Sequence, residues 1–273
     1  MKQYKYKTCS VVMAVYKNDK PAWVTKSIES LLSQTTKSND IVIVRDGQVP
    51  NRIEKILEKF ERDPNLTIIR LDSNIGAGPA RNLGIKATKN DLVAIMDADD
   101  ISMPKRFELQ LARFNKDSSL TIVGGQIAEF VDKPSNVVSY RKVPLEHRDI
   151  KKFAKRRSPF NNISVCIKRK VFIDLGGYEK INRAEDYSLW LKLLTSNYKT
   201  ANCPEVLCSV RINKASIKRR VTWDQTKQLI KLRWKYRRFI GLVNMFFVDT
   251  AQLLLLLFPA QFVNFVYKIG LRK

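Results

Sequence analysis

Apolar and polar positions along the first 115 residues follow a pattern typical of short strands separated by helices. Apolar runs rich in branched side chains predict buried strands, and the segments between them have apolar residues at helical spacing. Regular alternation of this kind predicts an α/β fold with an open, mostly parallel sheet flanked by helices. The expected strands are Thr8–Val15, Ile41–Val44, Leu66–Leu71 and Leu92–Met96, and the expected helices are Ala22–Gln34, Arg52–Phe60 and Pro79–Ala87.

The pattern continues less regularly beyond residue 115. We expect a helix at Pro104–Asn115, strands at Leu120–Phe130, Val137–Val143 and Ile163–Lys168, a polar loop at residues 144–158, and a helix from Glu185 to about Ser196. From Ser216 the chain becomes first basic and then apolar, so we place a boundary near Asn213. The expected organisation is a domain at residues 1–213, with halves at about 1–115 and 116–213, and a helical extension at 214–273.

Composition excludes several kinds of chemistry. The single histidine, His147, lies in a basic polar stretch where a solvated position is expected, so histidine-based triads and His-rich zinc sites are excluded. Catalysis must then rest on carboxylates. The four cysteines form no Cys-x-x-Cys pair, and Met1 precedes a charged segment without a signal-peptide core, which favours the reducing cytosol. A formal net charge of +24 indicates an anionic partner such as phosphates or lipid headgroups.

Three carboxylates, those of Asp97, Asp99 and Asp100, directly follow the apolar run Leu92–Met96. In extended backbone, side chains two positions apart point the same way, so Asp97 and Asp99 should converge while Ala98 faces away. Paired carboxylates suit a hard divalent cation such as Mg²⁺ or Mn²⁺. The alternative is an acidic N-cap for the helix that begins near Pro104.

The other strand ends of the first half also carry polar residues. Ligands of open α/β sheets bind beyond the carboxyl ends of the strands, so the residues that follow each strand should line one crevice. These are Tyr16, Asp46, Asn74 with Gly76, and the Asp97–Asp100 cluster.

Two further segments have a structural and a functional interpretation. Arg81 follows a glycine-rich turn and either binds a nucleotide or is a surface residue of a first helical turn. Glu185 and Asp186 precede an apolar helix; they either complement its dipole or provide a general base. The pair Gly176–Gly177 before Tyr178 either ends a helix or allows close approach of a ligand.

Taken in order, these motifs resemble family 2 glycosyltransferases of the GT-A fold, and among them the bacterial capsular and exopolysaccharide enzymes. The resemblance covers nearly the whole chain, and the order and spacing of the motifs make it specific. It rests on Ser10–Lys17, Ile41–Gly47, Asn74–Gly76 with Ala80–Asn82, Met96–Asp100, Gly176–Tyr178 and Glu185–Trp190.

The resemblance implies a metal-dependent, inverting enzyme that uses Mn²⁺ or Mg²⁺ and a nucleotide-sugar, with UDP expected. Asp186 would be the catalytic base and Asp99 would bind the metal, with its partner Asp97 of the DXD motif on the nucleotide. The remaining roles that the resemblance implies are nucleotide-sugar binding by Ala14, Val15, Tyr16, Asp46 and Arg81, and acceptor contact or site orientation by Gly177, Tyr178 and Glu185.

Two departures from the family pattern stand out. Asn162 occupies a position where the family often carries histidine, which puts in doubt any acceptor or phosphate contact made by that ring. The Gln-x-x-Arg-Trp motif of processive synthases is missing, since Gln228 and Arg233–Trp234 have another spacing. This favours the addition of one sugar per encounter.

The C-terminal part combines basic and apolar residues. The segment Phe239–Tyr267 is long enough to span a bilayer, but Asp249 near its centre opposes insertion. We expect residues 211–267 to bind an anionic membrane surface, with a buried helix or an oligomer contact as the alternative. The basic residues concerned are Arg211, Lys214, Lys218, Arg219, Arg220, Lys227, Lys231, Arg233, Lys235, Arg237 and Arg238.

Together these observations predict an enzyme at the cytoplasmic face of the plasma membrane. Its acceptor would be a polyprenyl-diphosphate-linked saccharide, as in related enzymes. Two alternatives remain open: a nucleotidyltransferase that shares the metal site, and a non-enzymatic nucleic-acid-binding protein motivated by the charge. Nucleic acid is not the expected partner, since three clustered carboxylates would repel phosphates.

Overall fold

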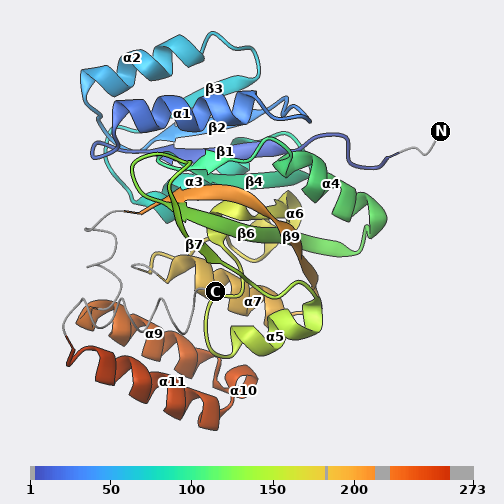
Figure 1. Ribbon diagram of the computed structural model, residues 1–273, viewed down its shortest axis with the longest axis vertical. Helices are drawn as coiled ribbons and strands as arrows, with labels where there is room; N and C mark the ends of the chain where they lie inside the picture. The colour runs from blue at the N-terminus through green and yellow to red at the C-terminus, as the bar shows by residue number, and fades with distance from the viewer. Residues whose placement is uncertain (1–3, 182–183, 213–221, 259–273) are drawn as a thin grey trace.

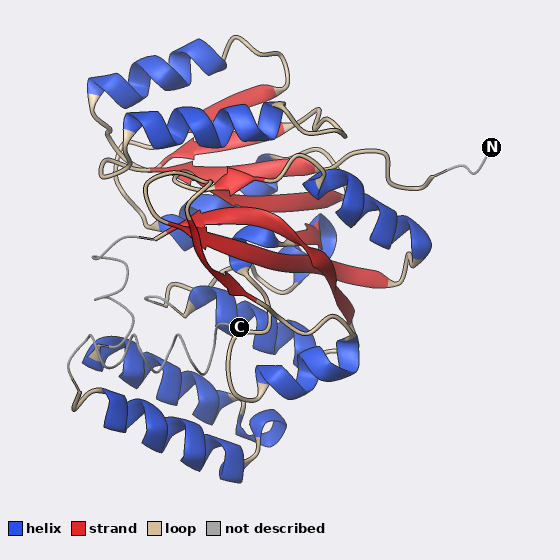
Figure 2. Ribbon diagram, viewed as in Figure 1, coloured by secondary structure: helices blue, strands red, loops and turns tan. Residues whose placement is uncertain are grey.

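The fold is described from a computed structural model, which places residues 4–181, 184–212 and 222–258. The expected boundary near Asn213, the basic residues 213–221 and the apolar residues 259–267 lie outside this range. Helices cover both faces of a central sheet, and a further helical layer follows at one end (Figures 1 and 2).

The strands among the described residues form one nine-stranded sheet with the order β3-β2-β1-β4-β8-β6-β9-β5, and β7 pairs with β6. The first four are parallel, and β8 then pairs antiparallel with β4. The strands are β1 (Ser10–Val15), β2 (Ile41–Arg45), β3 (Leu66–Arg70), β4 (Leu92–Asp97), β5 (Ile101–Ser102), β6 (Leu120–Phe130), β7 (Val137–Arg141), β8 (Cys166–Lys168) and β9 (Lys199–Arg211).

The helices form three groups, and each group packs around its own cluster of buried apolar side chains. Helices α1 (Pro21–Leu32), α2 (Asn51–Phe60) and α4 (Arg106–Lys116) pack on one face of the sheet. The other face is covered by α3 (Ala77–Ala87), α5 (His147–Ala154), α6 (Arg169–Asp174) and α7 (Glu185–Thr195), with the short 3₁₀ helix η1 (Asn162–Ser164) before β8. A third cluster joins α7 to α9 (Trp223–Lys235), α10 (Arg237–Ile240) and α11 (Leu242–Leu255).

Side-chain alternation in β1 shows how the sequence selects this two-layer packing. Val11 and Met13 point into the cluster beneath α1, while Val12 points into the cluster beneath α3. A strand buried on both faces reads as a continuous apolar run, which is the pattern of β1, β2 and β4, whereas the edge strand β3 exposes Thr67 and Arg70. The expected α/β fold with its parallel first half is confirmed.

Several expectations for the second half were wrong. Residues 147–154, expected in a loop, form α5, and the ring of His147 is within 2.9 Å of the Thr200 hydroxyl rather than free in solvent. The expected strand at Ile163–Lys168 begins with a 3₁₀ turn and becomes a strand only at Cys166. The apolar segment from Phe239 is interrupted at Gly241, whose φ of +86° separates α10 from α11.

No helix among the described residues is both long and apolar enough to cross a bilayer. Helices α9–α11 instead form a layer at the end of the molecule opposite α2 (Figure 1).

Candidate functional site

The residues that follow β1, β2 and β4, and the loop after β3, meet in one crevice, as the sheet topology predicts. A cavity of about 320 Å³ lies there. A second cavity of about 520 Å³ adjoins it and shares Asp46 and Asn74. The first cavity is lined by Ala14, Tyr16, Asp19, Asp46, Asn74, Gly76, Ala77, Arg81, Asp97, Ala98 and Asp99.

The end of β4 places three carboxylates together. Oxygens of Asp97, Asp99 and Asp100 lie within 4.8 Å of one another. Burial and the charge of Asp97 raise the pKa of Asp99 to about 6, and burial and the charge of Asp99 raise that of Asp100. Mutual repulsion of carboxylates at this distance is relieved by a cation, so the donor set fits a hard divalent ion.

The three acids differ in what they can still bind. Asp100 is buried and accepts the backbone N–H of Arg211 at 2.8 Å, which ties the loop to β9. Asp97 and Asp99 are both half-buried and line the cavity, and Asp97 accepts from the guanidinium of Arg81. Helix α4 begins at Arg106, after β5, and has no side-chain cap, so the alternative of an acidic N-cap is wrong.

Arg81 is the cation of the site. It lies in the second turn of α3 and is buried, and its Nη2 donates to Asp97. Burial raises the pKa of Glu185 and of Asp186, and the charge of Arg81 opposes that rise in both, so the end of β4 and the start of α7 share one electrostatic environment. The convergence of the β4 acids and Asp186 on a single site stays a prediction.

Asp46 is less accessible than expected for a residue that contacts a ligand. Its carboxylate accepts the backbone N–H groups of Ile75 at 2.7 Å and Gly76 at 3.0 Å, and the side-chain amide of Asn74 at 2.9 Å. Asp46 therefore holds the loop between β3 and α3 against the end of β2. It remains at the junction of the two cavities.

The three expected residues at the end of β1 do not all face the cavity. Ala14 and Tyr16 line it, but the side chain of Val15 is fully buried in the core beneath α1. Because side chains alternate along a strand, the side chain of Val15 lies on the opposite face of the sheet. Its contribution to the site is its backbone carbonyl, which accepts the N–H of Asp46 at 2.7 Å. The expectation that Val15 contacts the nucleotide is wrong for its side chain.

Glu185 and Asp186 form the first turn of α7 and are not among the residues that line the two cavities; Glu185 lies beside α3, where a Cβ built at Gly78 would meet its Cγ at 3.6 Å. Burial raises the pKa of Asp186, against the opposing charges of Arg141 and Arg81. Burial and the neighbouring charge of Asp186 raise the pKa of Glu185, whose Oε2 has no hydrogen-bond partner among the described residues. Carboxylates with raised pKa values at a cleft are suited to proton transfer.

The Gly176–Gly177 turn positions Tyr178. The N–H groups of Gly176 and Gly177 close the end of α6 onto Ile173 and Phe172, so the pair acts as a helix C-cap. Gly177 has a φ of +66°, and a Cβ there would meet the Asn82 side chain at 2.5 Å. The glycines therefore allow this turn to lie close to α3.

Asn82 secures this turn through two hydrogen bonds with the backbone of Tyr178, both of 2.9 Å. Tyr178 Oη donates to Asn162 Oδ1 at 2.8 Å, and the ring lies 6.0 Å from the Arg81 guanidinium. Asn162, which stands where the family often has histidine, therefore supports the tyrosine that borders Arg81.

Two residues at the site were not anticipated. Asp19 lines the cavity, accepts the N–H of Tyr16 at 2.8 Å, and has a pKa raised to about 7, chiefly by burial. Its position just after β1 was the available signal. Arg211, expected at a membrane, instead packs between Trp23 and Phe130 with ring distances of 4.5 and 4.6 Å.

Comparison with known proteins gives a consistent result. Residues 10–181 match the model of a protein family described as "Glycosyl transferase family 2". A protein of Haemophilus influenzae named "Uncharacterized glycosyltransferase" is 37% identical over 268 residues, which cover 97% of this chain and 99% of that protein.

Two further relatives carry more specific names. The amylovoran biosynthesis glycosyltransferase AmsE of Erwinia amylovora is 30% identical over 95% of this chain and 97% of its own length. The UDP-Gal:alpha-D-GlcNAc-diphosphoundecaprenol beta-1,3-galactosyltransferase of Escherichia coli is 30% identical over 97% of this chain and 96% of its own.

The fold itself is similar to that of S. aureus TarS 1–349. The two superpose with a TM-score of 0.61 at 15% identity, covering 86% of this chain and 81% of TarS.

Proposed function

The chain belongs to glycosyl transferase family 2 and is a glycosyltransferase, and from this premise we propose that it is a metal-dependent, inverting enzyme that transfers a sugar from a UDP-sugar to a lipid-linked saccharide. The observation that carries the proposal is the single crevice in which Asp97, Asp99 and Arg81 meet, with Asp186 in the same electrostatic environment.

The donor half of the site is at the ends of β1, β2 and β4. We assign to Asp99 the binding of a divalent cation, Mn²⁺ or Mg²⁺, which when bound supplies positive charge to the donor diphosphate. Asp97 and Arg81 would hold the nucleotide beside it, and Tyr16 and Ala14 would line the same wall. The second cavity, next to Asp46, offers room for the base.

The acceptor half is at the start of α7. Asp186 would take the proton of an acceptor hydroxyl while that oxygen attacks the anomeric carbon. The bond from this carbon to the diphosphate breaks in the same displacement, which inverts the configuration and releases a nucleoside diphosphate. Tyr178 and Glu185 would orient the acceptor or the reacting sugar, and Gly177 would hold Tyr178 in place.

Relatives support the acceptor class. The E. coli relative is named for a diphosphoundecaprenol-linked acceptor and a UDP-galactose donor, and AmsE for amylovoran biosynthesis. We therefore propose a polyprenyl-diphosphate-linked saccharide as acceptor, in the synthesis of a capsule or another surface polysaccharide. With such an acceptor, the enzyme would work at the cytoplasmic face of the membrane. We retain residues 1–213 as the catalytic unit and 214–273 as its extension.

Incubation with a panel of nucleotide-sugars in the presence of Mn²⁺ tests the proposal. We expect slow hydrolysis of a UDP-sugar to UDP, lost when the metal is chelated and lost in Asp99→Asn. The matched control is Asp91→Asn, which changes an exposed carboxylate at the opposite end of β4 and should keep full activity.

Two results would contradict the proposal. Release of inorganic diphosphate from a nucleoside triphosphate would indicate a nucleotidyltransferase. Full activity of Asp99→Asn at limiting Mn²⁺ would remove Asp99 from its assigned role.

A further inference from the structure

Helix α11 turns polar residues toward the protein and apolar residues toward the solvent, the reverse of the usual arrangement in a surface helix. Its polar residues Asp249 and Gln252 point inward and bind the guanidinium of Arg233 on α9, Gln252 at 2.8 Å. On the opposite side Val243 is 70% exposed and Phe246 is 68% exposed. An amphipathic helix at the surface of a globular protein normally turns its apolar stripe toward the core. The stripe of α11 is therefore built to contact something other than water.

The stripe has two parts on one side of the helix, residues 242–247 and residues 253–258, with exposed Thr250 and Ala251 between them. Leu257 and Phe258 follow the last residue of α11. Apolar patches of this kind are rare on soluble monomers and mark interaction sites. We name this surface the α11 apolar face, made of Leu242, Val243, Phe246, Phe247, Leu253, Leu254, Leu257 and Phe258.

Basic and aromatic side chains accompany this face on the neighbouring helices. Residues 223–258 contain six lysines and arginines and two aspartates, and one of these aspartates, Asp249, is paired internally with Arg233. Trp234 is 58% exposed, and the guanidinium of Arg237 lies 5.3 Å from its ring. The exposed cations of α9 and α10 are Lys227, Lys231, Lys235, Arg237 and Arg238.

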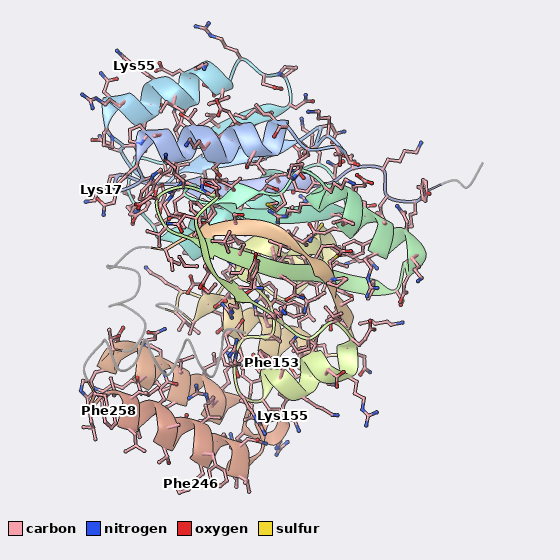
Figure 3. All side chains as sticks on the ribbon, in the orientation of Figure 1. Lys17, Lys55, Phe153, Lys155, Phe246 and Phe258 are labelled. Carbon is pink, nitrogen blue, oxygen red and sulfur yellow. The ribbon has the colours of Figure 1, made fainter. Side chains whose placement is uncertain are left out.

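Helix α5 extends the basic region. The amino group of Lys155, just after α5, lies 6.0 Å from the ring of Phe239 on α10. Figure 3 shows Phe153 and Lys155 at the same end of the molecule as Phe246 and Phe258, with Lys55 of α2 at the opposite end. One end of the protein thus presents apolar side chains together with basic ones.

We propose that the α11 apolar face docks on the surface of an anionic lipid bilayer. The helix would lie in the interface, with its apolar side chains among the acyl chains and the tryptophan and cations at the headgroups. Each basic residue near such a surface adds to the attraction between the protein and the anionic headgroups. A second copy of the chain fits less well, since it would bring two basic rims together.

Docking has a consequence for the candidate active site. Tyr187, next to Asp186, shares a buried cluster with Leu232 of α9 and Met245 of α11, and its hydroxyl donates to the Ala154 carbonyl at 2.6 Å. The docking face is thereby packed through α9 onto the helix that begins with the proposed base. The inference goes beyond the proposed function, because vesicle binding needs neither donor nor acceptor.

The first test places a fluorophore on the face in the full-length protein. All four cysteines are buried, so a Val243→Cys variant can be labelled selectively with an environment-sensitive dye. The matched control is Lys55→Cys on α2. With vesicles of phosphatidylglycerol and phosphatidylcholine we expect a blue shift at position 243 and none at position 55, and a weaker shift with phosphatidylcholine alone.

Other outcomes of this test overturn the proposal. An unchanged spectrum at position 243, or equal shifts at both positions, excludes docking through α11. If the label at 243 is already shielded from iodide in the free protein, another part of the chain covers the face.

The second test separates apolar docking from general charge attraction. We expect Phe246→Ser with Phe247→Ser to reduce partitioning onto anionic vesicles at least tenfold in a sedimentation assay. The control pair, Val138→Ser with Tyr140→Ser, changes exposed residues on β7 and should bind as the parent does.

The phenylalanine variant could bind vesicles as the parent does and lose this binding only at high salt. That result would show that charge alone holds the protein on the vesicle and would overturn apolar docking. Failure of the parent chain to bind vesicles, with a dimer that the phenylalanine variant abolishes, would assign the face to a second copy.

Discussion

Burial and the neighbouring arginine charges shift the pKa of Asp186 in opposite directions. Burial raises the pKa above the ordinary value of 3.8, and the charges of Arg141 and Arg81 and the backbone N–H of Tyr187 lower it, with burial prevailing. A general base works only when deprotonated, so transfer should be lost as the pH falls through this raised pKa. In a plot of kcat against pH, the midpoint of the acidic limb should therefore lie above the ordinary pKa of aspartate.

Replacing Arg141 by Gln tests this assignment. The change removes one of the lowering charges, so the pKa of Asp186 should rise further and the acidic limb should move to higher pH. The measurement is kcat against pH at saturating donor and Mn²⁺, with Arg148→Gln on the exposed side of α5 as control. A limb that stays in place in Arg141→Gln belongs to a group other than Asp186.

Arg211 shows how a residue distant in sequence can support the acidic loop. Its Nε donates to the Asp99 carbonyl at 3.3 Å, and its guanidinium is held between Trp23 and Phe130. We expect Arg211→Met to raise the Mn²⁺ concentration for half-maximal activity about tenfold while kcat at saturating Mn²⁺ stays nearly unchanged. Stability should fall by about 2 kcal/mol.

Metal titration of activity together with thermal unfolding provides the measurement for Arg211→Met. Arg62→Met, which changes an exposed arginine after α2, should alter neither. If the titration is unchanged although the protein is less stable, Arg211 supports the fold and not the loop geometry.

The sequence predicted that Asp97, Asp99 and Asp100 lie at the carboxyl end of the sheet, because they directly follow a buried apolar run. Asp97 and Asp99 were expected together on extended backbone with Ala98 facing away, but β4 ends at Asp97 and a turn over residues 97–100 brings the acids together, with Ala98 also lining the cavity. Strand periodicity does hold in β1, where it would have excluded Val15. Arg211 could not be placed, because its partners Trp23 and Phe130 are distant in sequence and are brought to it only by the pairing of β9 with β6.

At the scale of elements, close packing of α3 on the sheet sets the position of Arg81. Gly84 is buried in this helix, and a Cβ there would meet Val12 Cγ1 at 2.8 Å and Val44 Cγ2 at 3.0 Å. These methyl groups belong to β-branched side chains that cannot swing away. Glycine at this position therefore lets α3 lie close to β1 and β2, which brings Arg81 to Asp97.

Gly84→Ala should destabilise the protein by about 1–3 kcal/mol, because overpacking outweighs the gain in helix propensity of about 1 kcal/mol. Val12→Ala opens space at the same point. Denaturant unfolding of both single variants and the double variant should show that the double is more stable than the sum of the single effects predicts. Strict additivity would mean that the added methyl group does not meet Val12.

Elements of the second half were harder to predict because they bury polar residues. Asn202 in β9 is fully buried and donates to the Pro144 carbonyl at 2.6 Å. The pairing of β9 with β6 also shifts register near Gly125 and Gln126, which breaks the alternation of apolar residues. Helix α5 buries only Ile150 and Ala154, which is too little periodicity to identify a helix.

At the scale of the whole molecule, one buried ion pair holds the C-terminal layer together. Asp249 was expected to oppose membrane insertion, and the structure shows that it faces Arg233, whose side chain is 4% exposed. Asp249→Ala would leave this guanidinium buried without an acid, at a cost of about 3–5 kcal/mol. Amide hydrogen exchange should then accelerate in α9 and α11 while β1–β4 keep their protection.

A double variant, Arg233→Met with Asp249→Leu, separates charge burial from packing. It should recover much of the lost protection, since apolar replacements of a buried pair are often neutral. If the double variant exchanges as fast as Asp249→Ala, the pair contributes more than compensation of a buried charge.

The proposed catalytic and docking surfaces make a joint prediction about acceptors. With an acceptor embedded in anionic vesicles, Phe246→Ser with Phe247→Ser should raise the apparent KM about tenfold, because less enzyme resides at the surface that holds the substrate. With a water-soluble analogue that has a short lipid chain, the same variant should keep the kcat/KM of the parent. Equal loss on both acceptors would indicate damage transmitted through α7 to Asp186, and no loss on either would show that docking does not deliver the enzyme to its substrate.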